Sequence, residues 1–341
     1  MKLYDKNGYP DVKKILDLGL NFIFYVGGRG TGKTYTILKT CLEDEKIIML
    51  MRRSQTQTDM INKEEFMPYK PLCSDTGLDI RVEPVTKSNS KFVLYENDSP
   101  VRIIGYTCSL STIGNMRGFD GSDIDILFYD EFIKEKSEKT TLKYEGDSLL
   151  NAYETLNRNR ELSGKRPIIL LGAANAFDLA NPIFVRLGIV DAVEKAFQRG
   201  RELYIDKERS IIVINLERSP VSRKKRDTAL YRLLGDDDTF SKMALGNEFS
   251  YDDRSSIKSM PLTEMIPVCA VGGICIYHHK SDAFYYVSEH LSGSYEKFTS
   301  SETDLKRFVK KYGYKLHDKH MAKKVYFENY LTKAIFEQYI M

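Results

Sequence analysis

The most constraining stretch of this sequence is the octapeptide Gly-Gly-Arg-Gly-Thr-Gly-Lys-Thr at residues 27–34. The apolar and aromatic run before it, residues 21–26, predicts a buried strand, and residues 35–42 after it predict a helix. Strand, glycine-rich loop and helix in this order are typical of a phosphate-binding P-loop, whose backbone N–H groups and helix N-terminus face the phosphates. The sequence therefore predicts an α/β domain that binds a nucleotide.

Each residue type in this loop has a chemical reason to be there. Lys33 is expected to reach the β- and γ-phosphates of ATP, and Thr34 to hold Mg²⁺. Arg29 is expected to contact or gate the γ-phosphate. The glycines do not have the G-x-G-x-x-G spacing of a dinucleotide fold, which disfavours a Rossmann domain. The residues expected to bind the nucleotide here are Gly27, Gly28, Arg29, Gly30, Thr31, Gly32, Lys33 and Thr34.

Length and composition limit the remaining possibilities. With 341 residues the chain is long enough for two domains, and its net charge of +3 is only mildly basic. A nucleic acid would therefore be bound by local patches or by several subunits together. The cysteines form no C-x-x-C pair, which favours reduced, intracellular thiols. No apolar run is long enough to span a bilayer, and the N-terminus lacks the apolar core of a signal peptide, so no membrane partner is expected.

A second motif supplies the carboxylates that ATP hydrolysis needs. The apolar strand predicted at residues 124–129 ends in Asp130 and Glu131, which is a Walker B pattern with an additional acid. Asp130 is expected to bind Mg²⁺, and Glu131 to polarise the attacking water. Acidic pairs also follow strands in ordinary loops, but this pair follows a P-loop. The adjacent glutamate favours a motor-type ATPase over a nucleoside kinase or a small GTPase.

The next predicted strand and the helix before it carry further candidates. Asn175 follows the strand at residues 167–171, where a polar side chain beside Walker B could sense the γ-phosphate; the alternative is a plain loop asparagine. The helix predicted at residues 148–160 ends in two arginines. Phosphoryl transfer is often assisted by an arginine of a neighbouring subunit, for which Arg158 is the first choice and Arg160 the second. The alternative is a solvated basic helix end.

Three more arginines lie near predicted strand ends. Arg117 lies in a loop before the Walker B strand and could serve as an arginine finger or contact DNA. Arg52 and Arg53 follow the strand predicted at residues 46–51, whose end should open on the nucleotide side of the sheet. They are expected to contact the nucleotide, with Arg53 the stronger candidate, or to support Glu131.

Several of these motifs together resemble one known family, the DNA-packaging ATPases of the φ29-like phages. The resemblance covers residues 15–190 well and the remainder loosely. Its most specific parts are Asp-Glu-Phe-Ile and Arg-Asn-Arg-Glu. The stretches that carry it are 21–33, Arg52-Arg53, 130–136, 158–161, Asn175-Ala176 and Asn181-Pro182.

This resemblance implies a ring ATPase of the terminase type. Such proteins are P-loop NTPases of the additional-catalytic-glutamate class with a mostly parallel sheet. They are thought to act in the host cytoplasm as homo-oligomers, specifically pentamers, on the portal of an empty capsid, and to drive double-stranded DNA inward. The resemblance implies that Arg158 acts in trans, and Arg117 too, although the family is expected to have lysine there. A structural packaging RNA is a further possible partner.

The remainder of the chain is expected to form a linker and a second domain. The ATPase domain is assigned to residues 1–217, a charged, partly helical linker to 218–248, and a C-terminal domain to 249–341. The linker's basic run could follow nucleic-acid phosphates, or it could be a solvated helix face. That run contains Arg223, Lys224, Lys225 and Arg226.

The C-terminal domain is expected to be α/β as well. Two strands, 270–277 and 283–288, are predicted with a hairpin at 278–282 between them, followed by helices at 303–312 and 326–340. In the large terminases that the resemblance points to, this place belongs to an RNase H-like nuclease, whose two metals need several carboxylates. The strand ending at Tyr277 has no acid, and Glu289 is the one well-placed carboxylate. The domain is therefore expected to be nuclease-like in fold but inactive.

Three other functions remain open at this stage. The first is another P-loop DNA motor, such as a helicase or a partition or conjugation ATPase. The second is a terminase with an active nuclease, and the third a nucleotide-binding structural subunit without turnover. Glu131 disfavours the last of these, because a catalytic glutamate has no role without hydrolysis.

Overall fold

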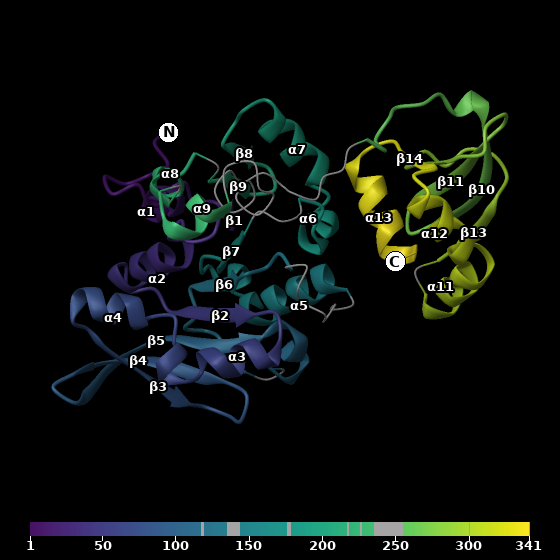
Figure 1. Ribbon diagram of the computed structural model, residues 1–341. Coiled ribbons are helices and arrows are strands. Elements are labelled where there is room, and N and C mark those ends of the chain that lie inside the picture. The colour runs from purple at the N-terminus through teal and green to yellow at the C-terminus, as the bar shows by residue number, and fades with distance from the viewer. Residues whose placement is uncertain are drawn as a thin grey trace. The chain divides into compact units, whose positions relative to one another are not determined.

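The computed structural model describes residues 1–116, 119–134, 144–175, 179–216, 218–225, 227–234, 255–299 and 301–340. They form two compact units, each with its own sheet (Figure 1). The first unit comprises residues 1–178 and 195–250, and the second residues 179–194 and 251–341. No helix in these described ranges is long and apolar enough to cross a membrane.

A mixed sheet of nine strands, counted over the described residues, forms the centre of the first unit. The strand order is β3-β4-β5-β2-β6-β7-β1-β9-β8. The six strands that are consecutive in this order, β5-β2-β6-β7-β1-β9, are parallel to one another. The edge strands β3, β4 and β8 pair antiparallel. The bounds are β1 Phe22–Gly27, β2 Ile48–Arg52, β3 Asp79–Pro84, β4 Ser90–Glu96, β5 Ser99–Ser109, β6 Ile126–Asp130, β7 Ile169–Asn175, β8 Leu203–Asp206 and β9 Ile211–Asn215.

The central strands are apolar without interruption because both of their faces are covered. Alternate residues such as Ile23 and Tyr25 of β1 pack with Ile37 of helix α2 in one core cluster. The residues between them face the other side of the sheet, where Phe24 contacts Phe132 edge to face. The first unit's helices are α1 Val12–Leu16, α2 Lys33–Glu43, α3 Gln55–Ile61, α4 Lys70–Thr76, α5 Glu145–Asn157, α8 Pro220–Lys225 and α9 Ala229–Leu234, with 3₁₀ turns η1 Glu64–Phe66, η2 Leu110–Met116 and η3 Glu161–Ser163.

The second unit has a five-stranded sheet of order β13-β10-β11-β12-β14 in its described part. Strands β10, β11 and β12 are antiparallel neighbours, while β13 runs parallel to β10 and β14 parallel to β12. The bounds are β10 Met265–Val271, β11 Ile274–His279, β12 Tyr285–Ser288, β13 Glu296–Phe298, β14 Val325–Phe327, α6 Pro182–Leu187, α11 Glu302–Phe308, α12 Tyr314–Met321 and α13 Tyr330–Ile340, with the 3₁₀ turn η4 Leu262–Glu264 and the π-helical turn η5 Val309–Gly313; α7 Val190–Gln198 begins in this unit and ends in the first.

Two sequence predictions for this unit are wrong. The strand expected at residues 270–277 is two antiparallel strands, because Gly272 and Gly273 adopt positive φ angles of 56° and 85° and turn the chain back between Val271 and Ile274. Such a Gly-Gly pair is a signal for a tight hairpin. The helix expected from residue 326 begins at Tyr330, because residues 325–327 add the parallel strand β14. The hairpin expected at 278–282 is confirmed, since β11 pairs antiparallel with β12.

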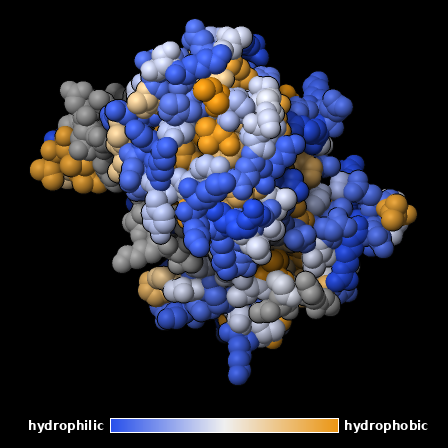
Figure 2. Space-filling model, turned by 90° about the vertical axis from the view of Figure 1, so that its right-hand side faces the viewer, coloured by the Kyte–Doolittle hydropathy of each residue, from blue (hydrophilic) through white to orange (hydrophobic). Residues whose placement is uncertain are grey.

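Exposed hydrophobic residues are visible on the one face of the molecule that Figure 2 draws. The face drawn in Figure 2 is mostly hydrophilic, and its hydrophobic residues form small patches with hydrophilic residues between them. Isolated surface residues of this kind are normal for a globular chain. This face therefore gives no sign of a large apolar docking surface.

Candidate nucleotide site

The phosphate loop connects the end of β1 to the start of α2, as predicted. Gly30 and Gly32 have φ angles of 65° and 85°, a region that residues with a side chain rarely adopt. At Gly32 there is also no room, because an added Cβ would lie 2.3 Å from the ring of Tyr9. The loop conformation therefore depends on glycine at both positions.

The ammonium group of Lys33 is buried at the head of this loop. Its Nζ donates to the carbonyl oxygens of Gly28 at 2.8 Å and Gly27 at 3.1 Å, and to Oδ1 of Asn175 at 3.4 Å. Burial lowers the pKa of Lys33 to about 8, and the negative charges of Asp130 and Glu131 oppose this effect. An anionic phosphate beside this lysine would favour its charged form.

The Walker B acids lie next to the loop. Asp130 ends β6, and its Oδ1 accepts a hydrogen bond from the hydroxyl of Thr34 at 3.0 Å. Carboxylate and hydroxyl oxygens are ligands that Mg²⁺ prefers. The oxygen atoms of this pair therefore fit a magnesium ion, as the sequence predicts for both residues.

Glu131 follows in a left-handed backbone conformation. Its φ is 59°, and its N–H donates to the carbonyl of Ala173 on the neighbouring strand at 2.7 Å. A non-glycine residue with positive φ is strained, and such strain is often found at functional sites. The carboxylate is 49% exposed, so it is accessible to water.

These groups share one cavity of about 510 Å³. The cavity is lined by residues 29–35 of the loop and helix, by Asp130 and Glu131, and by residues 173–175 at the end of β7. The carboxyl ends of the parallel strands β1, β6 and β7 meet here because they are neighbours in the sheet. The structure thus brings together the predicted loop, the Walker B acids and Asn175, which were separate signals in the sequence.

Arg52, the last residue of β2, and Arg53 after it have different roles, and the expected nucleotide contact of Arg53 is wrong. Arg53 is 2% exposed, and its guanidinium forms an ion pair with Glu145 and donates to the carbonyl of Phe132 at 2.8 Å. Tyr129 donates to the same Glu145 carboxylate at 2.6 Å. Arg53 therefore lies in a buried structural network that the sequence did not reveal, since Glu145 is 92 residues away along the chain and no motif links the two.

The contacts of Arg52 confirm the second expectation for these arginines, namely that one of them supports Glu131. Its Nη1 lies 2.6 Å from Glu131 Oε2, and its Nη2 lies 2.8 Å from Asp130 Oδ2. Successive residues of a strand point to opposite faces, so only one of the two arginines could reach the acids. That alternation is the sequence signal that could have distinguished them.

Arg158 and Arg160 are not among the described residues that line the cavity. Arg158 follows α5 and donates to the carbonyl oxygens of Phe119 at 2.8 Å and Thr155 at 3.0 Å. Arg160 donates to the carbonyl of Ile124, which favours a structural role. Arg117 lies outside the described residues, as do Ala176 and Arg226. Arg158 is exposed to solvent.

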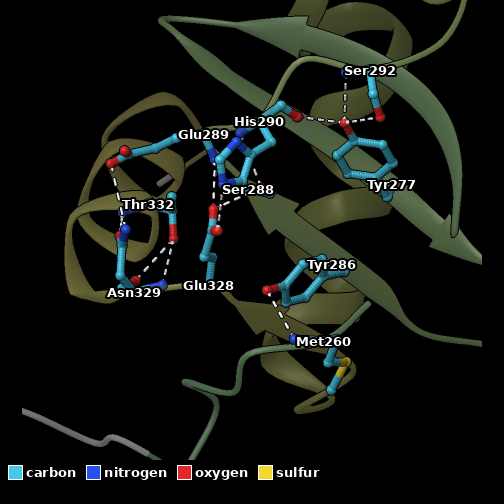
Figure 3. A network of polar contacts seen from close by, with 10 residues as sticks. All are labelled: Met260, Tyr277, Tyr286, Ser288, Glu289, His290, Ser292, Glu328, Asn329 and Thr332. Atoms are coloured by element: carbon cyan, nitrogen blue, oxygen red, sulfur yellow. Dashed lines mark hydrogen bonds and ion pairs between the residues drawn. The ribbon is translucent and has the colours of Figure 1, made fainter. Parts of the chain in front are cut away.

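Two acids of the second unit, Glu289 and Glu328, take part in a network at the ends of β12 and β14 (Figure 3). Glu328, directly after β14, accepts hydrogen bonds from the hydroxyl of Ser288 at 2.6 Å and from the N–H of Glu289 at 3.0 Å, and its other oxygen lies 3.3 Å from His290. Glu289 in turn accepts from Asn329 at 3.5 Å. Glu328 has no signal in the sequence, because it comes close to Glu289 only through the pairing of β12 with β14.

Comparison with known proteins gives a consistent result. A family model described as "Podovirus DNA encapsidation protein (Gp16)" matches residues 4–331. The DNA packaging protein of Bacillus phage phi29 is 24% identical over 255 residues, which are 74% of this chain and 70% of the relative. The DNA packaging protein of Bacillus phage B103 is 26% identical over 239 residues, or 68% and 65% of the two chains. The resemblance seen in the sequence is thereby confirmed.

Two solved structures share the fold over nearly the whole chain. The Phi-28 gp11 DNA packaging motor matches with a TM-score of 0.66 and 20% identity, covering 98% of both chains. The bacteriophage Phi-29 viral genome packaging motor assembly matches with a TM-score of 0.65 and 16% identity, covering 99% of this chain and 98% of that one. The similarity includes both units.

Proposed function

The chain belongs to the family of Podovirus DNA encapsidation proteins (Gp16), and from this premise we propose that it is an ATP-driven motor that moves double-stranded viral DNA into a preformed capsid. The observation that carries the proposal is the convergence of the phosphate loop with Asp130, Glu131 and Asn175 around one cavity. This set contains a group for each task in ATP hydrolysis.

The chemistry follows from the positions of these side chains. Lys33 binds the β- and γ-phosphates, and Thr34 with Asp130 holds Mg²⁺, which when bound offsets phosphate charge. Glu131 accepts a proton from the attacking water, and its exposed carboxylate has access to that water. Asn175, which already accepts a hydrogen bond from Lys33, senses the terminal phosphate.

The sheet order supports assignment to the additional-catalytic-glutamate class of P-loop NTPases. Strand β7 lies between the phosphate-loop strand β1 and the Walker B strand β6. This inserted strand places Asn175 between the loop and the acids. It also supplies the Ala173 carbonyl that fixes the backbone of Glu131.

The working form we propose is a homo-oligomeric ring, specifically a pentamer, on the portal of the procapsid in the host cytoplasm. The names of the similar solved motors support an assembly. The exposed Arg158, which does not line the cavity of its own chain, supports catalysis in trans, and we assign the same role to Arg117. A structural packaging RNA is a further candidate partner.

We also propose that residues 1–217 are the ATPase domain, 218–248 the linker and 249–341 a nuclease-like domain without activity, although residues 179–194 group with the second compact unit. The order β12-β11-β10-β13, with β13 parallel to β10, supports an RNase H-like sheet, although β14 lies at the β12 edge. The hydrogen bonds of Glu328 support inactivity, since both of its oxygens are engaged in joining strand ends.

The test is ATP hydrolysis with and without double-stranded DNA, in the wild type and in Glu131→Gln. Hydrolysis that DNA stimulates strongly, and that the substitution abolishes, is the expected result. Hydrolysis indifferent to DNA, at concentrations high enough for assembly, would instead favour a different P-loop ATPase such as a partition protein. Stimulation by single-stranded DNA alone would favour a helicase.

A further inference from the structure

One lysine of the linker's basic run lies on the phosphate loop. Lys225 is the last residue of α8, and its Nζ donates to the carbonyl oxygen of Arg29 at 2.8 Å. The same Nζ lies 1.9 Å from the position that a Cβ on Gly30 would occupy. The ammonium group therefore contacts the part of the loop that lines the nucleotide cavity.

Packing holds the helix that carries this lysine. Ser219 and Ser222 are buried, and Pro220 at the start of α8 fits against Gly8, where an added Cβ would lie 2.8 Å from the proline Cβ. Arg223 and Lys224, in contrast, are exposed. Lys225 thus differs from its neighbours in the basic run, which the sequence could not separate.

The charge at this position has no anion to balance it among the described residues. Burial lowers the pKa of Lys225, and no carboxylate offsets that effect. Burial is the largest cause that lowers the pKa of Lys33, Asp130 and Glu131 oppose it, and the charge of Lys225 adds to the lowering. The neutral carbonyl of Arg29 does not neutralise the charge of Lys225, whereas a phosphate group bound beside the loop would.

We propose that Lys225 binds the terminal phosphate of the bound nucleoside triphosphate, so that linker helix α8 responds to the presence of that phosphate. The terminal phosphate is the one concerned because Lys33 is expected to reach the β- and γ-phosphates, and Lys225 contacts the loop at Arg29 and Gly30, which line the same cavity as Lys33. The inference rests on the proposed function, since it requires a nucleotide in this cavity. It adds a contact from the linker to the contacts of the loop itself.

The experiment compares the affinities of the full chain for AMP-PNP and for ADP, both with Mg²⁺, in the wild type, Lys225→Ala and Lys224→Ala. A charge-assisted hydrogen bond to phosphate corresponds to about tenfold or more in affinity. We expect Lys225→Ala to bind AMP-PNP about tenfold more weakly and to bind ADP as the wild type does. Lys224→Ala removes the same charge from the exposed face of α8 and should change neither affinity.

Every other outcome overturns the inference in a recognisable way. Equal loss of both affinities in Lys225→Ala, with a lower melting temperature, assigns the lysine to the structure of the loop alone. Unchanged affinities, or the same change in Lys224→Ala, leave no specific phosphate contact. If the wild type binds neither nucleotide, the proposed function itself fails, whereas tight binding with no effect of Lys225→Ala rejects only the contact.

Discussion

The guanidinium of Arg52 lies 2.6 Å from the carboxylate of Glu131, and it also lies 2.8 Å from the carboxylate of Asp130. One side chain at the end of β2 thus holds the two acids of the Walker B motif in a common orientation. Arg52 is 14% exposed, so these contacts are shielded from water more than a surface ion pair would be.

Removing this arginine should impair catalysis. In Arg52→Ala, the two carboxylates lose their shared partner, and we expect ATP turnover to fall by about tenfold or more because Glu131 is no longer positioned. Arg52→Lys should give an intermediate rate, since an ammonium group lacks the planar fork that engages two carboxylates. Steady-state hydrolysis with saturating ATP measures the effect. A rate in Arg52→Ala equal to or above that of the wild type would contradict it.

Nucleotide binding should depend on pH through Lys33. Burial places the pKa of its ammonium at about 8, below the ordinary 10.5, so the unfolded chain binds more protons between these values. The contribution of Lys33 to the free energy of unfolding therefore becomes more favourable as pH rises from about 8 to 10.5. Bound phosphate favours the charged form, so ADP affinity should fall by up to about tenfold per pH unit above pH 8. Calorimetric titration from pH 7 to 10 measures this fall.

A matched variant separates this effect from the other titrating groups. Lys33→Arg keeps its positive charge throughout that pH range, so its ADP affinity, although different at pH 7, should lack the decline. If the ADP affinities of the wild type and of Lys33→Arg fall in parallel above pH 8, the titrating group is not Lys33.

The buried pair of Arg53 and Glu145 should matter for stability. Both side chains are 2% exposed, and Glu145→Ala would leave the arginine charge buried without its partner. We expect a loss of about 3–5 kcal/mol in the free energy of unfolding, measured by urea denaturation. Glu154→Ala, at an exposed position of the same helix, should cost less than about 0.5 kcal/mol. The double variant Arg53→Met with Glu145→Met should lose less than Glu145→Ala; a larger loss would show that the ion pair itself stabilises the fold.

Catalysis in trans predicts complementation between inactive subunits. Glu131→Gln retains Arg158, and Arg158→Ala retains Glu131, so neither is expected to hydrolyse ATP well alone. In mixed assemblies some interfaces contain both intact residues, and partial ATPase activity should return. Absence of recovery, with mixed assembly confirmed by differently tagged subunits, would remove the assignment of Arg158.

The second unit should not cleave DNA. Supercoiled plasmid incubated with the full chain and Mg²⁺ or Mn²⁺ is expected to remain intact, because Glu328 is engaged by Ser288, Glu289 and His290. Gel electrophoresis detects nicking. Metal-dependent nicking that co-purifies with the wild type and disappears in Glu328→Ala would show an active nuclease.

Local patterns were sufficient to predict much of the site. The phosphate loop needs glycines with positive φ between a strand and a helix, and the Walker B acids must follow an apolar strand, so both can be recognised from neighbouring residues. Asn175 could be predicted because parallel strands bring their carboxyl ends to one edge. The hairpin at Gly272-Gly273 also has a local signal, the glycine pair itself. The apolar residues on both sides of that pair nevertheless favoured the prediction of one continuous strand.

What the sequence by itself determined is the chemistry at the strand ends: a phosphate loop, two acids and a polar residue beside them. Only the tertiary structure decided which basic residues serve that chemistry. Arg52 reaches the acids while Arg53 pairs with Glu145, and Lys225 reaches the loop while Lys224 stays in solvent. The physical reason is that an arginine or lysine carries its charge on a long side chain. Its partner is set by whichever distant segment packs beside it, and no local spacing encodes that packing.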